Sequence, residues 1–175
     1  MRRKTMKDVM IREAMPEDAE KLIDYLNEIG GESNHLLHGA NEFQITVEKE
    51  REFVTRIKNA KNECMLVGIC YGEIVSVASL SGYVKKRVAH RGSLGVSVRK
   101  SYWNQGIGTK MIERLIAFAK SASICVIELE VKEDNENAIA LYEKMGFEKI
   151  GRYKKYFCIE GMYYDAYLMN LYLDL

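Results

Sequence analysis

The sequence predicts a single α/β domain, in which four helices pack against a mixed, largely antiparallel and twisted sheet of about seven strands. The chain has 175 residues, which is enough for one hydrophobic core of ordinary size. Its composition, 47% hydrophobic and 29% charged, is typical of a soluble globular domain. Short runs of alternating apolar residues indicate strands, and longer runs with apolar residues every three or four positions indicate helices.

The first part of this domain, residues 10–60, is predicted to hold a short strand and two helices. The strand covers Met10 to Arg12, and a helix begins near Pro16 and ends at Gly30-Gly31. The apolar stripe of this helix consists of Ala19, Leu22, Ile23, Leu26 and Ile29. A second helix, Val47 to Asn59, follows Thr46, whose hydroxyl suits the N-cap position.

The second part, residues 63–131, is predicted to supply the middle of the sheet. Glu63 to Cys70 and Ile74 to Leu80 flank a hairpin turn at Tyr71-Gly72-Glu73. Val88 to Val98 forms the next strand. Ile124 to Val131 is so densely apolar that it is expected at the centre of the sheet and not at its edge.

The stretch from Leu94 to Lys120 within this part carries the strongest functional signal. An alternating strand is followed by Gly106-Ile107-Gly108 and then by an amphipathic helix with apolar positions Ile107, Met111, Ile112, Leu115, Ile116 and Ala119. Strand, glycine turn and helix together direct unpaired backbone N–H groups at a phosphate. The residues match neither a P-loop nor the dinucleotide fingerprint, because no Gly-Lys-Ser/Thr follows and position 111 is Met.

The third part, residues 135–175, is predicted to be one helix and a final hairpin. The helix covers Asn135 to Met145 and ends at Gly146. The strands Phe147 to Ile159 and Met162 to Leu173 meet at a turn around Glu160-Gly161. The sequence shows no repeat or linker, so residues 1–175 are taken as one domain.

Composition argues against several classes of function. A formal net charge of +1 does not indicate a nucleic-acid-binding surface. The basic run Lys85-Lys86-Arg87 beside Tyr83 is predicted to be a solvated turn. No run of 18 apolar residues is present, and Arg2-Arg3-Lys4 precedes no apolar segment, so neither a membrane span nor a signal peptide is expected. We therefore expect a cytoplasmic protein with reduced, buried thiols at Cys64, Cys70, Cys125 and Cys158.

A metal site is not expected either. The polar segment from Glu32 to Phe43 contains His35, His38 and Glu42, but two histidines three positions apart in such a segment are more often solvated. The four cysteines have no metal-ligand spacing.

Two motifs together resemble the GNAT superfamily of acyl-CoA-dependent N-acetyltransferases, including ribosomal-protein and amine N-acetyltransferases. The first is residues 103–108, WNQGIG, which fits the family's Arg/Gln-x-x-Gly-x-Gly/Ala pattern except for Trp103. The second is the family's Asn-x-x-Ala-hydrophobic-x-x-Tyr-Glu-x-x-Gly-Phe pattern, here at Asn135, Ala138, Tyr142, Glu143, Gly146 and Phe147. They stand in the family order, and the resemblance covers residues 63–173.

The resemblance implies a splayed cleft that binds acetyl-CoA as a cosubstrate, without a metal. The main chain of Val96, Ser97 and Val98 would pair with the pantetheine amides, and Asn135 would bind from the opposite side. The pyrophosphate would lie on the loop and helix start formed by Trp103, Asn104, Gln105, Gly106, Ile107, Gly108 and Thr109. Backbone amides carry this binding, so Trp103 in place of Arg or Gln weakens the motif without removing it.

The resemblance also assigns the proton transfers. Tyr142 is the expected general acid toward the departing thiolate, and its phenol, with a reference pKa of about 10, is protonated at pH 7. Glu130 is the first candidate for the general base, because a Leu-Glu-Val glutamate holds this position in ribosomal-protein acetyltransferases. Glu32, His90 and a chain of water molecules are the alternatives.

The expected activity is direct transfer of an acetyl group from acetyl-CoA to a primary amine in a ternary complex. The acceptor is left open between a small molecule and a protein, because the segment from Gly30 to Phe43 offers both acidic and apolar side chains. A non-catalytic acyl-CoA sensor on the same fold is the alternative, but it has no need of Tyr142. A homodimer through the C-terminal hairpin or an exposed strand is open, and no residue decides it.

Overall fold

The structure, a computed structural model, describes residues 8–174. The Arg2-Arg3-Lys4 segment, where no signal peptide was expected, lies outside this range. Within it, no helix has the length and apolar character needed to cross a bilayer.

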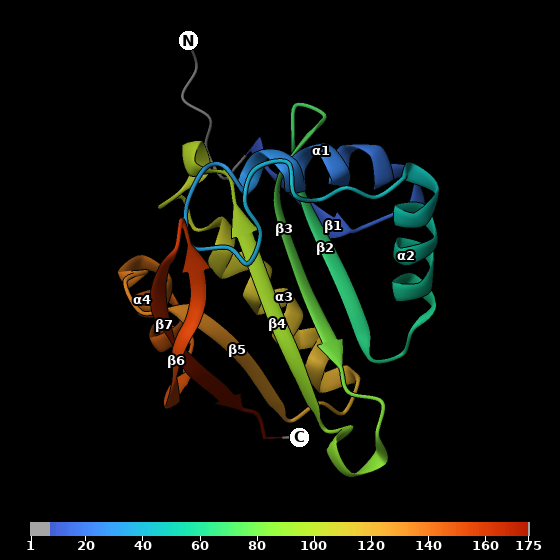
Figure 1. Ribbon diagram of the computed structural model, residues 1–175. Coiled ribbons are helices and arrows are strands. Elements are labelled where there is room, and N and C mark those ends of the chain that lie inside the picture. Colours follow the sequence, from blue (N-terminus) through green and yellow to red (C-terminus); the bar gives the residue numbers. More distant parts are fainter. Residues whose placement is uncertain (1–7, 175) are drawn as a thin grey trace.

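Seven strands of the described chain form one sheet in the order β1-β2-β3-β4-β5-β7-β6 (Figure 1). The strands are β1 (Met10–Glu13), β2 (Glu63–Cys70), β3 (Glu73–Gly82), β4 (Arg91–Val98), β5 (Val126–Lys132), β6 (Glu148–Ile159) and β7 (Met162–Tyr172). The helices are α1 (Ala19–Ile29), α2 (Val47–Asn59), α3 (Ile107–Ser121) and α4 (Glu136–Lys144). Only β4 and β5 pair in parallel within the described range, so the predicted mixed, largely antiparallel sheet is confirmed.

Helices cover both faces of the sheet, and two separate apolar clusters result. We call the face packed by α1 and α2 the front face; Leu22, Tyr25, Val54 and Val77 belong to its cluster. We call the other the rear face, where α3 and α4 pack, farther from the viewer in Figure 1. Burial of each Leu or Ile side chain contributes roughly 1.5–3 kcal/mol, so the larger rear cluster is the main source of stability.

The predicted elements agree with the observed ones to within a few residues, and the differences have local causes. Helix α2 has the predicted bounds, and the Thr46 hydroxyl accepts a hydrogen bond from the Lys49 N–H at 3.3 Å. The strand expected from Val88 begins at Arg91, because residues 86–88 form a 3-10 turn. In α1 the buried stripe includes Tyr25, whereas the predicted Ile23 is only half-buried.

The expectation of four buried thiols is wrong for two of them. Cys64 and Cys70 are buried, but Cys125 is half-buried and Cys158, on β6, is exposed. Strand β6 lies at the edge of the sheet, so its side chains are covered less than those of the central strands. All four cysteines are free thiols.

Glu50 is a buried acidic residue on α2, and its burial affects how the stability of the protein depends on pH. Its side chain is 1% exposed, and its Oε2 has no hydrogen-bond partner. Burial raises the pKa of this carboxyl above its ordinary value of 4.5. The folded state therefore holds the proton more tightly than the unfolded state, and stability is lost as pH rises through and above this value.

Replacing Glu50 with Met is expected to raise the free energy of unfolding at pH 7.5 by about 1–2 kcal/mol, because an unpaired buried carboxylate is removed. The gain should shrink toward pH 4.5, where the wild-type carboxyl is protonated. Urea unfolding at both pH values measures this. Glu52→Met, at an exposed position of the same helix, is the control and should change stability by less than about 0.5 kcal/mol. An equal gain in both variants would contradict the prediction.

Candidate active site

The two parallel strands at the centre of the sheet separate along their length. β4 and β5 pair at three positions only, from Arg91↔Val126 to Ser93↔Glu128. Beyond these, β4 continues to Val98 paired with β3, while β5 continues to Lys132 paired with β7. The splay that the family resemblance implied is therefore present, and it opens toward the carboxyl ends of both strands.

The splay leaves one edge of β4 without a partner strand. Arg99 donates its N–H to the Val75 carbonyl at 2.9 Å, so odd-numbered residues at this end direct their main-chain groups toward β3. The N–H and C=O of Val96 and the N–H of Val98 consequently face the cleft. Trp103 donates its indole N–H to the Val98 carbonyl at 2.6 Å. An extended ligand can pair with this edge at Val96.

Ser97 differs from its neighbours and from the expectation. Its main chain is paired with Val77 in β3, and its hydroxyl shares a 2.9 Å hydrogen bond with the Tyr25 hydroxyl. Ser97 lines the cleft, but its main chain is not available to a ligand there. The motif counts positions along the chain and contains no information on which edge of a strand each residue presents.

The loop after β4 presents unpaired amides at the start of α3. Gly106 is the N-cap with φ 81°, and Asn104 also has a positive φ of 59°. The first hydrogen bond inside the helix is from Lys110 N–H to the Gly106 carbonyl at 3.1 Å. The N–H groups of residues 107–109 therefore have no partner within the helix, and no acidic residue lies in its first turn. This is an anion-binding geometry.

Two residues of this loop have more specific positions. A Cβ on Gly108 would lie 3.2 Å from Leu141 Cδ2, so glycine lets the start of α3 approach α4 closely. The Gln105 side chain turns back and donates to the Ser101 carbonyl at 3.2 Å. Gln105, expected among the binding residues, does not contribute to the cavity wall.

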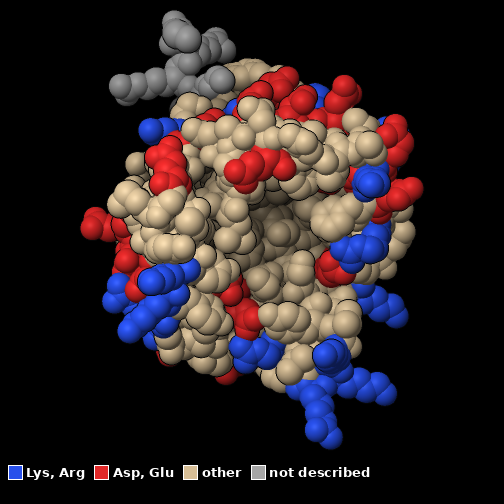
Figure 2. Space-filling model, in the orientation of Figure 1, with Lys and Arg blue, Asp and Glu red and all other residues tan. Residues whose placement is uncertain are grey.

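A cavity of about 640 Å³ occupies the splay, a volume suited to a small-molecule ligand. Figure 2 shows it as a hollow near the centre of the front face, with uncharged walls and acidic residues at its rim. The expected site residues that line it are Val96, Ser97, Val98, Trp103, Asn104, Gly106, Ile107, Gly108, Thr109, Glu130, Asn135 and Tyr142. Residues of both predicted motifs thus meet in one space.

Tyr142 lies on the rear side of this cavity. Its helix, α4, is capped by Asn135, whose side-chain oxygen accepts the Ala138 N–H at 3.3 Å. The Tyr142 ring is 7% exposed and packs at a tilt against Phe147, with 5.6 Å between centroids. Burial raises the pKa of Tyr142 to about 12, so its hydroxyl holds a proton at neutral pH.

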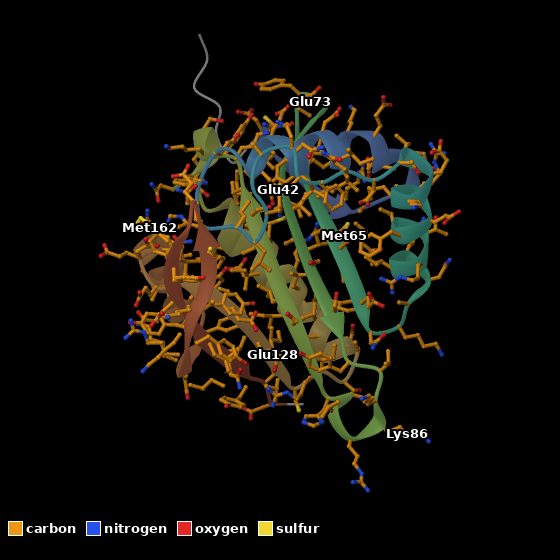
Figure 3. The ribbon with its side chains drawn as sticks, in the orientation of Figure 1. Glu42, Met65, Glu73, Lys86, Glu128 and Met162 are labelled. Carbon is orange, nitrogen blue, oxygen red and sulfur yellow. The ribbon has the colours of Figure 1, made fainter. Side chains whose placement is uncertain are left out.

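Glu130 reaches the same cavity from the front side. It alternates along β5 with residues of the rear cluster, and it forms no ion pair within residues 8–174. Burial, and then the nearby charge of Glu128, raise the pKa of the Glu130 carboxyl. Glu128 itself is paired with Arg91 and accepts the Tyr83 hydroxyl. In Figure 3, Glu128 lies at the level where β4 and β5 are still paired.

The two alternative bases are placed elsewhere. Glu32 bonds the Lys100 N–H and lies 3.5 Å from the Arg99 guanidinium, outside the cavity wall. His90 precedes β4 at the closed end of the splay, where its carbonyl accepts the N–H groups of Cys125 and Val126. Neither side chain lines the cavity, which leaves Glu130 as the carboxylate within it.

Several cavity residues were not predicted as site residues from the sequence, and His35 and Tyr156 are two of them. His35, in the segment between α1 and α2, has its Nε2 3.6 Å from Asp134 Oδ1 across the mouth of the splay. Tyr156 reaches the cavity from an irregularity in β6, where Lys155 has φ 56° and donates its N–H to Asp165 at 2.8 Å. A bulge and an irregular segment have no periodic signal in the sequence, so these positions could not be read from it.

The metal alternative finds no support in geometry. No group of three or more His, Cys, Asp or Glu side chains that could hold a metal ion occurs within residues 8–174. His38, one of the residues considered, places its Nε2 3.1 Å from the Leu26 carbonyl. Glu42 of the same segment lies in front of β3 and β4 (Figure 3).

Comparisons with known proteins place this geometry in a family. Residues 33–147 match the family model described as acetyltransferase (GNAT) family. A crystal structure of a GNAT-family acetyltransferase from Streptococcus pneumoniae superposes with a TM-score of 0.91 at 30% identity, covering 94% of this chain and 99% of that one. The overall fold is therefore shared with a solved member of that family.

Similarity to curated proteins is more partial. N-alpha-acetyltransferase RimI of Mycobacterium tuberculosis is 36% identical over 75 residues, 43% of this chain and 44% of that protein. L-amino acid N-acetyltransferase AaaT of Escherichia coli is 28% identical over 130 residues, 74% of this chain and 80% of that protein. The chain also matches an uncharacterised Mycobacterium leprae protein, of which it spans only 20%. The chain thus spans less than half the length of the Mycobacterium leprae protein and of RimI, but four fifths of AaaT.

Proposed function

The chain belongs to the GNAT acetyltransferase family, and from this membership we propose that it transfers an acetyl group from acetyl-CoA to a primary amine. The observation that carries the proposal is the passage through the splay between β4 and β5. It joins an anion-binding helix start, a free strand edge at Val96, a buried phenol at Tyr142 and an unpaired carboxylate at Glu130. These are the groups that acetyl transfer to an amine needs.

The shape and polarity of the cleft fit acetyl-CoA. Its pantetheine amides would pair with the main chain of Val96, and its pyrophosphate would bind the N–H groups of residues 106–109. Asn135 would contact the cosubstrate from the opposite side of the splay. Each such hydrogen bond contributes on the order of 1 kcal/mol, so affinity depends on several acting together. When bound, acetyl-CoA supplies an activated acetyl thioester.

Two side chains of the protein, Glu130 and Tyr142, then carry out the proton transfers. Glu130 accepts a proton from the acceptor ammonium, directly or through water, and leaves a neutral amine. The amine nitrogen forms a bond to the acetyl carbon, and the bond between that carbon and the sulfur breaks. Tyr142 donates the proton at its hydroxyl to the departing sulfur. The newly bonded nitrogen loses its second proton to water, which restores the Tyr142 hydroxyl, and Glu130 releases its proton to solvent. The products are an N-acetyl amine and CoA with a free thiol.

The acceptor enters from the front face and the cosubstrate from the side of α3. Glu130 lies on the acceptor side and Tyr142 on the cosubstrate side, so each faces the atom whose proton it handles. A protein that only bound acyl-CoA would need the free strand edge and helix start but not this pair. The free thiols fit a reducing compartment, and we place the reaction in the cytoplasm.

The proposal is tested by measuring free-thiol release from acetyl-CoA with a mixed panel of amines, alongside acetyl-CoA affinity by calorimetry. We expect release only when an amine is present and acetyl-CoA binding in its absence. If acetyl-CoA binds but no amine of any class releases thiol, the enzyme assignment is overturned in favour of an acyl-CoA sensor.

A further inference from the structure

The charges on the cavity wall restrict the acceptor. Within residues 8–174, no Lys or Arg side chain lines the cavity, and Glu130 is its one carboxylate. A free amino acid carries a carboxylate beside its amine, and that carboxylate would have to approach Glu130 without a cation to pair with it. Like charges at such close range repel each other, which disfavours binding of the free amino acid.

The two histidines on the wall do not replace a cation. His35 faces Asp134, so a carboxylate already lies against it at 3.6 Å. Burial, and more weakly the charge of Lys132, lower the pKa of His35, whereas Asp134 opposes this, and the ring is neutral at pH 7. His38 is bonded through Nε2 to the Leu26 carbonyl. His35 therefore offers no fixed positive charge to an acceptor carboxylate, and the Nε2 of His38 already has a main-chain partner.

The floor of the cavity continues along the front face beyond the reacting groups. It is made of small residues on paired positions of β3 and β4, with Ser79 opposite Gly95 and Ser81 opposite Ser93. From Ser97 to Ser93 this floor is about 13 Å long, at roughly 3.3 Å per strand residue. Three or four residues of an extended peptide have this length, whereas a single amino acid does not.

The walls and floor also match the chemistry of a peptide. Leu26 and Ile29 of α1, with Leu36 and Leu37 of the following segment, form an apolar wall over the floor. The serine hydroxyls of the floor can donate to and accept from peptide main-chain groups. A peptide has a neutral amide where a free amino acid has its carboxylate. It therefore brings only the amine's positive charge to Glu130.

We propose that the acceptor is the α-amine at the N-terminus of a peptide or protein, bound extended along the front face with uncharged first residues. This rests on the proposed acetyl transfer and names its substrate class. An α-amine with a pKa of about 8 is neutral in about one molecule in ten at pH 7, compared with about one in 2,500 for a lysine side chain. A single carboxylate base is sufficient to deprotonate an α-amine, but it is too weak a base for a lysine side chain.

The test compares acceptors that differ in the carboxylate beside the amine, in length, and in the kind of amine. Alanine, alanine amide, and a six-residue peptide with N-terminal alanine are each assayed by thiol release. The same peptide with a blocked N-terminus and an internal lysine is the fourth acceptor. We expect kcat/KM for alanine amide to exceed that for alanine at least 100-fold, and the free peptide to exceed the amide at least 10-fold. The blocked lysine peptide should give no release above background.

Two variants separate charge from shape. Ser81→Arg adds a cation at an exposed position of the floor. The ratio of kcat/KM for alanine amide to kcat/KM for alanine should fall at least 10-fold in this variant. Gly95→Leu fills the floor, where a Cβ has room at 3.7 Å from Ser79 Oγ, so the fold should tolerate it. Its KM for the peptide should rise at least 10-fold, while its acetyl-CoA affinity stays within twofold of wild type.

The outcomes distinguish this inference from the function on which it rests. Alanine reacting as well as its amide, or a lysine peptide reacting as well as the free N-terminus, overturns the substrate class and leaves acetyl transfer standing. No release from any acceptor, although acetyl-CoA binds, overturns both.

Discussion

Replacing Tyr142 with Phe is expected to lower kcat by about 10²–10³-fold while acetyl-CoA affinity stays within about twofold. The ring of Tyr142 is buried against Phe147, and a phenylalanine ring fills the same space. The hydroxyl has no hydrogen-bond partner within the described residues and opens to the cavity, so its removal leaves no buried group unpaired. The fold should therefore be preserved, and the loss should fall on protonation of the departing thiolate.

Stopped-flow and steady-state thiol release measure the change in turnover, and calorimetry measures acetyl-CoA binding. Tyr25→Phe is a matched control, because it also removes a hydroxyl from a fully buried tyrosine. That hydroxyl is bonded to Ser97, so this variant should lose about 1 kcal/mol of stability and retain turnover within a few-fold. A Tyr142→Phe enzyme with unchanged kcat would exclude the phenol as the proton donor.

Most of the fold could be predicted because each element follows a local rule. The Thr46 cap fixes the start of α2, and the positive φ of Gly146 lies directly after α4, where a helix favours glycine. The start of β4 was misplaced because Val88 is apolar but lies in an exposed 3-10 turn. An apolar residue type alone does not distinguish a buried strand from an exposed turn.

The candidate site was predictable only where its residues share one element or one motif. Tyr142 and Asn135 lie on a single helix and its cap, so their spacing already places them on the cleft. Ser97 and Gln105 were assigned by position in a motif, whereas strand register and a hydrogen bond to Ser101 decide their roles. The set of charged residues around the cavity could be listed only once the fold was known, because the wall combines residues of α1, four strands and two further helices.

Replacing Glu130 with Gln is expected to lower kcat/KM for the acceptor by about 10–100-fold at pH 6.5, and by less than about fivefold at pH 9. At low pH the amine is protonated and needs a base, whereas above its own pKa of about 8 it is already neutral. The base must be ionised to act. Because burial and Glu128 raise the pKa of Glu130, wild-type activity should fall as pH decreases through a value above 4.5.

The same raised pKa predicts that this variant folds well. A carboxyl whose pKa is higher in the folded state contributes stability that is present below its unfolded pKa and lost as pH rises, so its ionised form opposes folding at pH 7. Glu130→Gln should therefore be at least as stable as wild type. Glu128→Gln, on the same face of β5, weakens the contacts to Arg91 and Tyr83 and should lower stability. Its pH profile should keep the loss of activity at low pH, displaced to lower pH because the Glu128 charge no longer raises the pKa of Glu130. If the pH profile of Glu130→Gln matched that of wild type from pH 6 to 9, Glu130 would not be the general base. Water would then accept the proton, or only acceptor molecules that are already neutral would react. The Glu130 carboxylate would serve only to attract the ammonium group.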